Sequence, residues 1–159
     1  MKNKFILDVT AGFRMMWFNK AHPNCIYLDE RPECEPDIVA DFRDLKQFED
    51  NKFRLIIFDP PHIIKHPSPT TPNMQRDYGA LSPDTWDTDL IRAFNELWRI
   101  LKPMGVLLFK WHTCSRSGAK VMKLFPIKPL IYQVSRVSVA KKHKNHLHTL
   151  WFCFMKIPE

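Results

Sequence analysis

The stretch LIIFDPPHIIKHPSPTTP, residues 55–72, begins as a hydrophobic run that ends abruptly at Asp59-Pro60-Pro61-His62. Neither proline can donate a hydrogen bond to a neighbouring strand, and each fixes its own φ angle. Pro60 also disfavours helical backbone at Asp59, because its ring clashes with the preceding residue. The motif therefore predicts a rigid bend at a strand end that holds one carboxylate and one imidazole. A simple strand-ending turn is the alternative interpretation.

Apolar runs of strand length alternate with amphipathic runs of helix length on both sides of this motif. Strands are expected at 4–9, 25–30, 37–41, 52–58, 106–111, near 130–139 and at 147–156. Helices are expected at 12–21, 82–102 and 117–125, a helix or turn at 42–51, and a turn at 102–105. This alternation, closed by a hairpin, predicts an α/β fold with a mainly parallel sheet and an antiparallel strand at its end.

Two of the expected helices have specific signals in the sequence. Ser82 suits the N-cap of the helix at 82–102, which carries an apolar stripe with a period of about 3.6 residues. The helix at 12–21 would place Phe13, Met16 and Trp17 on one face, because residues three and four apart are neighbours on a helix surface.

A chain of 159 residues with 45% apolar residues suits one folded domain rather than a disordered protein. We therefore expect a single domain over 1–159, without a separate target-recognition domain. The segment 62–83 contains several prolines and Gly79, and is expected to be a long loop. Loops longer than about 12–15 residues in compact domains often cover or bind a ligand, so this segment is a candidate substrate loop.

The sequence contains neither a signal peptide nor an apolar run of transmembrane length, so a cytoplasmic protein without a membrane partner is expected. Its four cysteines form no CxxC pair, and neither disulfides nor a metal centre are expected from them. The histidine-rich connector at 139–148 has no carboxylate or cysteine close in sequence, so we expect phosphate contacts or a solvated loop there rather than a metal.

Charge is divided unevenly along the chain. Residues 1–96 contain 16 acidic and 12 basic side chains, a sum of −4, whereas residues 97–158 contain twelve Lys and Arg and no acid. One interpretation is a lysine-rich solvated surface. The interpretation that we favour is a surface for a polyanion, with nucleic acid (DNA or RNA) as the expected partner.

Four aspartates lie at or near the ends of the first four expected strands: Asp8, Asp29, Asp41 and Asp59. In an open α/β sheet, ligands bind outside the carboxyl ends of the strands. One acid at a strand end is common, but four in succession predict a lined pocket.

The first strand is followed by the sequence DVTAGFR, residues 8–14, in which Gly12 would let the backbone approach a ligand closely. Asp29 lies at the end of the second strand, where an acid holds ribose hydroxyls in Rossmann-like folds. Asp41, after the third strand, is placed to accept a hydrogen bond from an adenine amine. A helix N-cap or a solvated turn is the alternative role for each acid.

The order of these motifs resembles the class I S-adenosylmethionine-dependent methyltransferases over nearly the whole chain. The sequence FDPPH, residues 58–62, is similar to the motif of the amino-methyltransferase branch, in which an aromatic residue follows the two prolines. Within this branch the sequence resembles small phage-type and bacterial enzymes without a target-recognition domain. The resemblance implies a Rossmann-like, seven-stranded sheet with helices on both faces. It also implies that S-adenosylmethionine contacts Asp8, Thr10, Ala11, Gly12, Asp29 and Asp41.

The resemblance further implies a mechanism for the proline bend. Asp59 and the carbonyl of Pro60 would accept the two hydrogens of a substrate amine, and Pro61 would keep both acceptors still. His62 stands where the family has an aromatic ring for stacking, and an imidazole offers less area and can take up a proton. The remaining substrate contacts are expected from Lys65, Arg76, Tyr78, Lys110 and Trp111.

These expectations lead to one preferred function and two alternatives. The preferred function is methylation of an exocyclic amino group, in particular adenine N6 of DNA or RNA. The first alternative is methylation of a protein side-chain amide or a small molecule. The second is a catalytically inactive module that binds nucleotides or nucleic acid.

Overall fold

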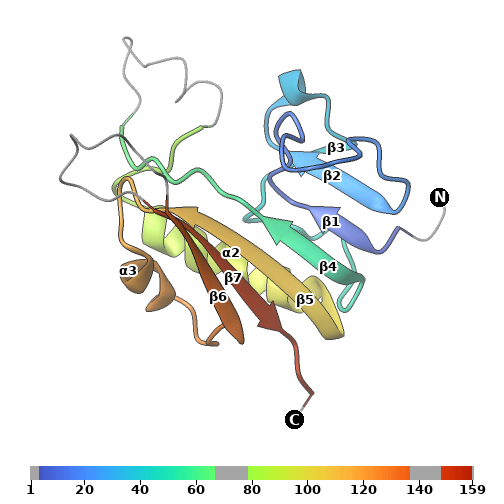
Figure 1. Cartoon of the computed structure of the whole chain (residues 1–159). Helices are drawn as coiled ribbons and strands as arrows, with labels where there is room; N and C mark the ends of the chain where they lie inside the picture. Colours follow the sequence, from blue (N-terminus) through green and yellow to red (C-terminus); the bar gives the residue numbers. More distant parts are fainter. Residues whose placement is uncertain (1–3, 67–78, 137–147, 159) are drawn as a thin grey trace.

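The computed structural model describes residues 4–66, 79–136 and 148–158, and its elements are shown in Figure 1. The strands are β1 (Ile6–Asp8), β2 (Cys25–Asp29), β3 (Ile38–Val39), β4 (Phe53–Phe58), β5 (Leu101–His112), β6 (Ile131–Arg136) and β7 (His148–Met155). The helices are η1 (Pro32–Cys34), α2 (Trp86–Ile100) and α3 (Gly118–Met122). Neither α-helix of the described residues is long and apolar enough to cross a bilayer.

The seven strands form one sheet in the order β3-β2-β1-β4-β5-β7-β6. The pairs between neighbours from β3 to β5 are parallel, whereas β7 is antiparallel to both β5 and β6. This arrangement confirms the expected mainly parallel sheet with an antiparallel C-terminal strand. The strand order reverses between β1 and β4, which is the switch point where ligands bind in open α/β sheets.

Helix α2 packs its apolar stripe against the centre of the sheet. Leu90, Ala93, Phe94 and Leu97 are all buried, as their 3.6-residue spacing predicts. The helix begins at Trp86 rather than at Ser82, after a turn in which the Ser82 carbonyl accepts from the backbone N–H groups of both Thr85 and Trp86.

Strand β5 follows α2 directly, so the turn expected at 102–105 is instead a bulge within the strand. Phe53 pairs with Leu101, but Leu55 already pairs with Val106, so four residues of β5 lie opposite a single residue of β4. Met104 adopts a left-handed φ of 61° inside the bulge, which a regular strand does not allow.

The helix expected at 12–21 is wrong, because the chain makes consecutive turns there. The N–H of Arg14 donates to the carbonyl of Ala11, and the N–H of Trp17 donates to the carbonyl of Arg14. Gly12 and Arg14 have φ angles of 49° and 56°, and left-handed residues interrupt a right-handed helix. Phe13 is 52% exposed, so the expected apolar face is not buried.

Both described α-helices lie on the same face of the sheet, and Figure 1 shows α2 behind the strands. The Phe94 ring of α2 contacts Phe154 of β7, and Gly118 of α3 lies against Leu150 and Phe152 of the same strand. On the opposite face, Trp17 packs edge-on against Tyr27 of β2. Turns therefore take the place of a helix on that face of β1 and β2 within the described residues.

Candidate functional site

A cleft opens at the carboxyl ends of the parallel strands, at the switch point between β1 and β4. Its volume is ≈310 Å³. It is lined by Asp8, Thr10, Ala11, Gly12, Phe13, Met15, Met16, Arg31, Asp59 and Lys110. We call it the central cleft. Five of the residues predicted as cofactor or catalytic residues therefore lie together there: Asp8, Thr10, Ala11, Gly12 and Asp59.

Asp59 follows β4 directly and is held from two sides. Its backbone N–H donates to Thr10 Oγ1 at 2.8 Å, and its Oδ2 accepts from Lys110 Nζ at 2.6 Å. Its Oδ1 is buried and has no hydrogen-bond partner among the described residues. Burial raises the pKa of Asp59, although the charge and hydrogen bond of Lys110 lower it. The carboxylate therefore keeps one acceptor atom available beside the cleft.

Asp8 ends β1 and is 1% exposed. Its Oδ2 accepts from Trp17 Nε1 at 2.6 Å, and its Oδ1 accepts from the backbone of Thr10 at 3.4 Å. Burial raises the pKa of Asp8 to about 6 against these hydrogen bonds. Asp8 thus fixes the first turn below the cleft, and the indole of Trp17 holds it from the turns that replace the expected helix.

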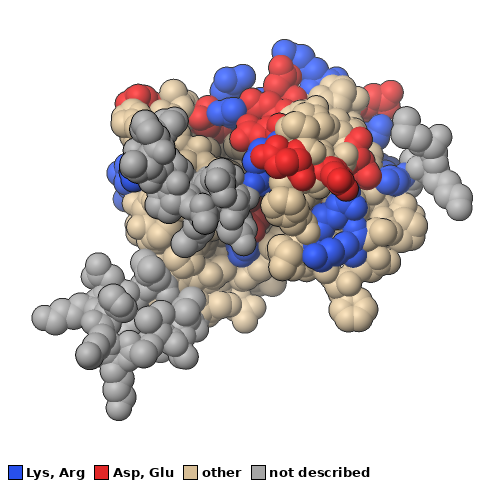
Figure 2. All heavy atoms as spheres, turned by 90° about the horizontal axis from the view of Figure 1, so that it is seen from above, with Lys and Arg blue, Asp and Glu red and all other residues tan. Residues whose placement is uncertain are grey.

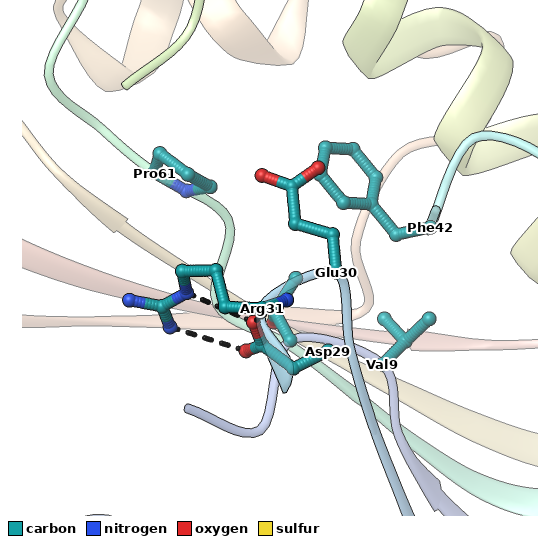
Figure 3. Close-up of a pocket in the computed structure, with 7 residues that line it drawn as sticks. Val9, Asp29, Glu30, Arg31, Phe42 and Pro61 are labelled. Carbon is teal, nitrogen blue, oxygen red and sulfur yellow. Dashed lines mark hydrogen bonds and ion pairs between the residues drawn. The ribbon is translucent and has the colours of Figure 1, made fainter. Parts of the chain in front are cut away.

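A smaller pocket of ≈20 Å³ adjoins the central cleft. It is lined by Val9, Thr10, Asp29, Glu30, Arg31, Phe42 and Pro61. We call it the narrow pocket. In Figure 3, the Glu30 carboxylate lies between Pro61 and Phe42, whereas Asp29 lies against Arg31. The pocket thus joins the ends of β1 and β2 to the proline bend.

Asp29 has no lone pair left for another ligand in this arrangement. Its Oδ1 accepts from the backbone and Nε atoms of Arg31, and its Oδ2 accepts from Gly12 N at 2.7 Å and from Arg31 Nη2. A carboxylate offers about four lone-pair sites, and four donors occupy them here. A ribose could contact Asp29 only after Arg31 moves. Glu30 has the freer carboxylate, with Arg43 at 3.9 Å as its ion-pair partner.

Asp41 is paired with Arg43 and does not line either cavity. Both of its carboxylate oxygens accept from Arg43 Nε, and Arg43 also reaches the buried Asp89. Burial raises the pKa of Asp41, but the hydrogen bonds and charge of Arg43 outweigh that effect and lower it. Phe42, the next residue, contributes the ring that lines the narrow pocket.

The substrate residues expected around the cleft are only partly brought together. Lys110 lines the central cleft through its contact with Asp59, whereas Lys65 is exposed and lines neither cavity. Trp111 does not line the central cleft, contrary to the expected substrate contact. It is 0% exposed and donates its indole N–H to the Arg116 carbonyl, so it packs in the core. It faces the cleft residues only indirectly, through an edge contact with the His62 ring. Arg76 and Tyr78 lie outside the described residues.

His62 is half-buried beside the rings of Trp111 and His112. Burial, together with the neighbouring His112 and Lys110, lowers the pKa of His62 to about 4, so its ring is neutral at physiological pH. The two described ends of the expected substrate loop are joined, because Ile64 and Leu81 form a parallel bridge.

Arg31 and Glu30 line the cavities but were not predicted from the sequence, and neither were the contacts of Trp17 with Asp8 and of Lys110 with Asp59. An arginine two positions after a strand-end aspartate was a local signal for Arg31. No local signal existed for Lys110, because its partner lies 51 positions away.

Charges of both signs are mixed around the strand ends. Figure 2 shows acidic and basic side chains beside one another on the face seen from above. Among the cations of the C-terminal half, Lys120, Lys123 and Lys128 are exposed on and after α3. The described residues thus provide local groups of cations rather than one continuous basic surface on that face.

No family model matches the sequence, and no curated protein is similar to it. Similarity is found instead among solved structures. An S-adenosylmethionine-dependent methyltransferase from Methanosarcina mazei has a TM-score of 0.62 and 11% identity, over 100% of this chain and 95% of the other. A putative rRNA-methylase from Clostridium thermocellum has a TM-score of 0.58 and 13% identity, over 98% and 89% of the two chains.

A third similar structure carries ligands. It is the 1,6-didemethyltoxoflavin-N1-methyltransferase from Burkholderia thailandensis, with bound 1,6-didemethyltoxoflavin and S-adenosylhomocysteine. Its TM-score is 0.56 and its identity 14%, over 97% of this chain and 71% of the other. At such identities the similarity establishes only a fold that this chain shares with these methyltransferases. A shared fold does not by itself establish a shared reaction.

Proposed function

We propose that this protein is an S-adenosylmethionine-dependent methyltransferase that acts on an exocyclic amino group. The observation that carries the proposal is the buried Oδ1 atom of Asp59, which lacks a partner among the described residues. A buried acceptor without a partner costs about 1–3 kcal/mol, so its presence beside a cleft indicates a ligand donor. An amine N–H group is the donor that the motif requires.

The two cavities fit the cofactor by the chemistry of their donors and by the space at Gly12. Gly12 has a left-handed φ, and a Cβ there would lie 3.3 Å from Arg31 Nη2, so a side chain would crowd the floor of the cleft. We assign the adenosine part to the end of the central cleft that adjoins the narrow pocket, where Glu30 would accept the ribose hydroxyls and Asp29 would hold Gly12 and Arg31 in place. Asp8, Thr10 and Ala11 would line the methionine part. Asp41 lies outside both cavities, so it would reach the adenine amine only after Arg43 releases it.

The bound cofactor would supply an electrophilic methyl group, and the residues of this chain would prepare the amine that accepts it. Asp59 Oδ1 and the Pro60 carbonyl would take the two N–H groups of the amine, which aligns the nitrogen lone pair. Lys110 holds Oδ2 at 2.6 Å and so prevents the carboxylate from rotating. The raised pKa of Asp59 also suits it to receive the proton that the amine loses. Preorganised orientation of this kind is worth several kcal/mol.

We favour a base of DNA or RNA as the substrate, with adenine N6 as the target amine. The twelve cations and absent acids of residues 97–158 support a polyanionic partner. The rRNA-methylase among the similar structures agrees with this choice. His62 supports the alternative of a small-molecule amine, because a neutral imidazole offers a smaller stacking surface than the aromatic rings used to hold extruded bases.

One labelling experiment tests the proposal and identifies the substrate class. The protein would be incubated with methyl-tritiated S-adenosylmethionine and with total DNA, total RNA, cell protein or a small-molecule extract. We expect label in a nucleic-acid fraction, as a methylated exocyclic amine. Label in the small-molecule fraction would favour the alternative. If calorimetry detects no S-adenosylmethionine binding, or if no fraction is labelled, the proposed function is wrong.

A further inference from the structure

Two histidines and a cysteine from separate parts of the chain meet at the rim of the sheet, next to the proline bend. His62 follows β4, His112 is the last residue of β5, and Cys114 lies two positions further on. β4 and β5 are parallel neighbours, and Phe58 pairs with Phe109, so the segments that leave these strands run side by side. The sequence separates His62 from the other two by about fifty positions.

The candidate ligand atoms of these three side chains all lie within 4.8 Å of one another. The His62 and His112 rings are 5.2 Å apart between centroids. Cys114 Sγ lies 3.3 Å from the His62 carbonyl, to which its thiol donates. A backbone hydrogen bond from Ile64 to Ser115 Oγ at 3.0 Å ties the same two segments together. The cluster is therefore held by the fold rather than by one adaptable loop.

A second observation points to a ligand. The Nδ1 atoms of both His62 and His112 are buried without a hydrogen-bond partner among the described residues. Buried polar atoms nearly always have a partner, so two orphan ring nitrogens in contacting rings need an explanation. Among the described residues, no side chain forms a hydrogen bond with either nitrogen. One cation bound between the two rings would provide a partner for both.

We propose that His62, His112 and Cys114 form a binding site for Zn²⁺. Two imidazoles and one thiolate are a donor set that Zn²⁺ prefers, and three protein ligands leave a fourth position for water. Tetrahedral Zn²⁺ with bonds of about 2.0–2.3 Å needs ligand atoms about 3.5 Å apart. Rotation of the exposed Cys114 side chain would bring its sulfur closer to the two imidazoles, and small shifts of the rings would complete the contraction. On coordination, the thiol gives up its proton to solvent, and the sulfur bonds to the metal as thiolate.

The position of the site gives the metal a structural consequence. Coordination would join the segment after β4 to the segment after β5, three positions from Asp59. It would also fix the His62 ring, which would then be held in the rim and withdrawn from any stacking role. The proposal is independent of methyl transfer, because it concerns metal binding by the isolated chain.

Cobalt provides a direct spectroscopic test, because Co²⁺ can replace Zn²⁺ and has visible absorption bands that depend on its ligands, whereas Zn²⁺ has none. The full chain, freed of metal by a chelator, would be titrated with Co²⁺ and then with Zn²⁺. We expect one equivalent of Co²⁺ to produce a thiolate-to-metal charge-transfer band and tetrahedral visible bands, and Zn²⁺ to remove both. Absence of these bands in the native chain would overturn the proposal.

Matched cysteine variants locate the site. Cys114→Ser should lose the charge-transfer band and weaken Zn²⁺ binding at least about 10-fold, since even outer partners of metal ligands are worth 10–100-fold. Cys153→Ser should retain both, because Cys153 pairs with Leu108 in the middle of the sheet. If Cys153→Ser removes the band, or Cys114→Ser leaves it intact, the assignment is wrong.

His112 is half-buried, so its replacement can lower stability apart from any effect on metal binding. The shift of the unfolding midpoint on addition of Zn²⁺ separates the two effects. Zn²⁺ should raise the unfolding midpoint of the native chain and leave that of His112→Gln and Cys114→Ser unchanged. A native chain whose midpoint does not respond to Zn²⁺ would contradict the proposal. A midpoint that rises equally in all three proteins would place the metal elsewhere.

Discussion

The Nζ atom of Lys110 lies 2.6 Å from the Oδ2 atom of Asp59, although 51 positions separate the two residues. Both side chains are mostly buried, with exposed fractions of 23% and 19%. The pair joins the end of β4 to the end of β5 and fixes the orientation of the carboxylate. The proposed amine site is therefore built on two neighbouring parallel strands rather than on one motif.

Removal of the Lys110 ammonium should destabilise the fold in a pH-dependent way. Lys110→Met leaves a buried carboxylate without its cation, at a cost of about 1–3 kcal/mol. Because burial already raises the pKa of Asp59, loss of Lys110 raises it further. A raised folded pKa favours the protonated form, so the cost shrinks at acidic pH and grows as pH rises. Urea unfolding at about pH 5 and pH 8 measures both values.

The exposed Lys123 provides the matched control for this variant. Lys123→Met should change the free energy of unfolding by less than about 0.5 kcal/mol at either pH. A Lys110→Met cost that is equal at both pH values would show that the ammonium does not act through Asp59.

Asp59→Ala should abolish most methyl transfer and leave cofactor affinity nearly unchanged. The substitution removes the acceptor proposed for the amine, and loss of one preorganised polar group costs about 10²–10³ in rate. Single-turnover transfer and calorimetric titration with S-adenosylmethionine measure the two effects. The control is Asp84→Ala, at an exposed position before α2. Unchanged turnover in Asp59→Ala would remove the proposed amine site.

The two acids at the end of β2 should differ in what their replacement disturbs. Glu30→Gln should weaken cofactor binding about 10-fold without lowering stability, because its carboxylate lies in the narrow pocket. Asp29→Asn should lower both the affinity for the cofactor and the stability of the fold, because it breaks the contacts that hold Gly12 and Arg31. Calorimetry and thermal unfolding separate the two effects. A normal affinity in Glu30→Gln would return the ribose role to Asp29, with Arg31 displaced on binding.

Asp8 should make the fold less stable as pH rises from about 4 to 7. Its folded pKa is about 6, above the ordinary value of 3.8, because it is buried. The stability gained from the protonated form is complete below the unfolded pKa and is lost as pH rises through 6. This difference amounts to on the order of 3 kcal/mol.

Asp8→Asn tests this dependence, because asparagine does not titrate and can still accept from Trp17. The difference in free energy of unfolding, variant minus native chain, should increase between pH 4 and pH 7 by on the order of 2–3 kcal/mol. A constant difference across that range would mean that Asp8 is ionised in the folded protein at all these pH values.

The sequence predicted the sheet well because its strands and α2 are set by local periodicity. The apolar run before Asp59 and the stripe from Leu90 to Leu97 keep their expected structure, since burial of those faces requires it. The strand-end aspartates also gather as expected, because carboxyl ends of parallel strands share one edge of the sheet. Asp41 is the exception, since Arg43 holds it outside both cavities.

The failure at 12–21 has a physical cause. Helix propensities differ by less than about 1 kcal/mol per residue, so tertiary contacts can override them. Here Trp17 donates to the buried Asp8 and packs on Tyr27. The chain reaches these contacts through left-handed residues at Gly12 and Arg14, which a continuous right-handed helix does not contain.

The amino-acid order alone indicates that two prolines end a buried strand at Asp59 and that further acids end its neighbours. Which side chains meet at these ends depends on the three-dimensional fold: Lys110 contacts Asp59, Arg31 lies near Gly12, and His112 and Cys114 lie beside His62. The reason is that strand neighbours in a parallel sheet are joined by long connections. Contacts between their ends therefore depend on strand order and register, which no short stretch of sequence specifies.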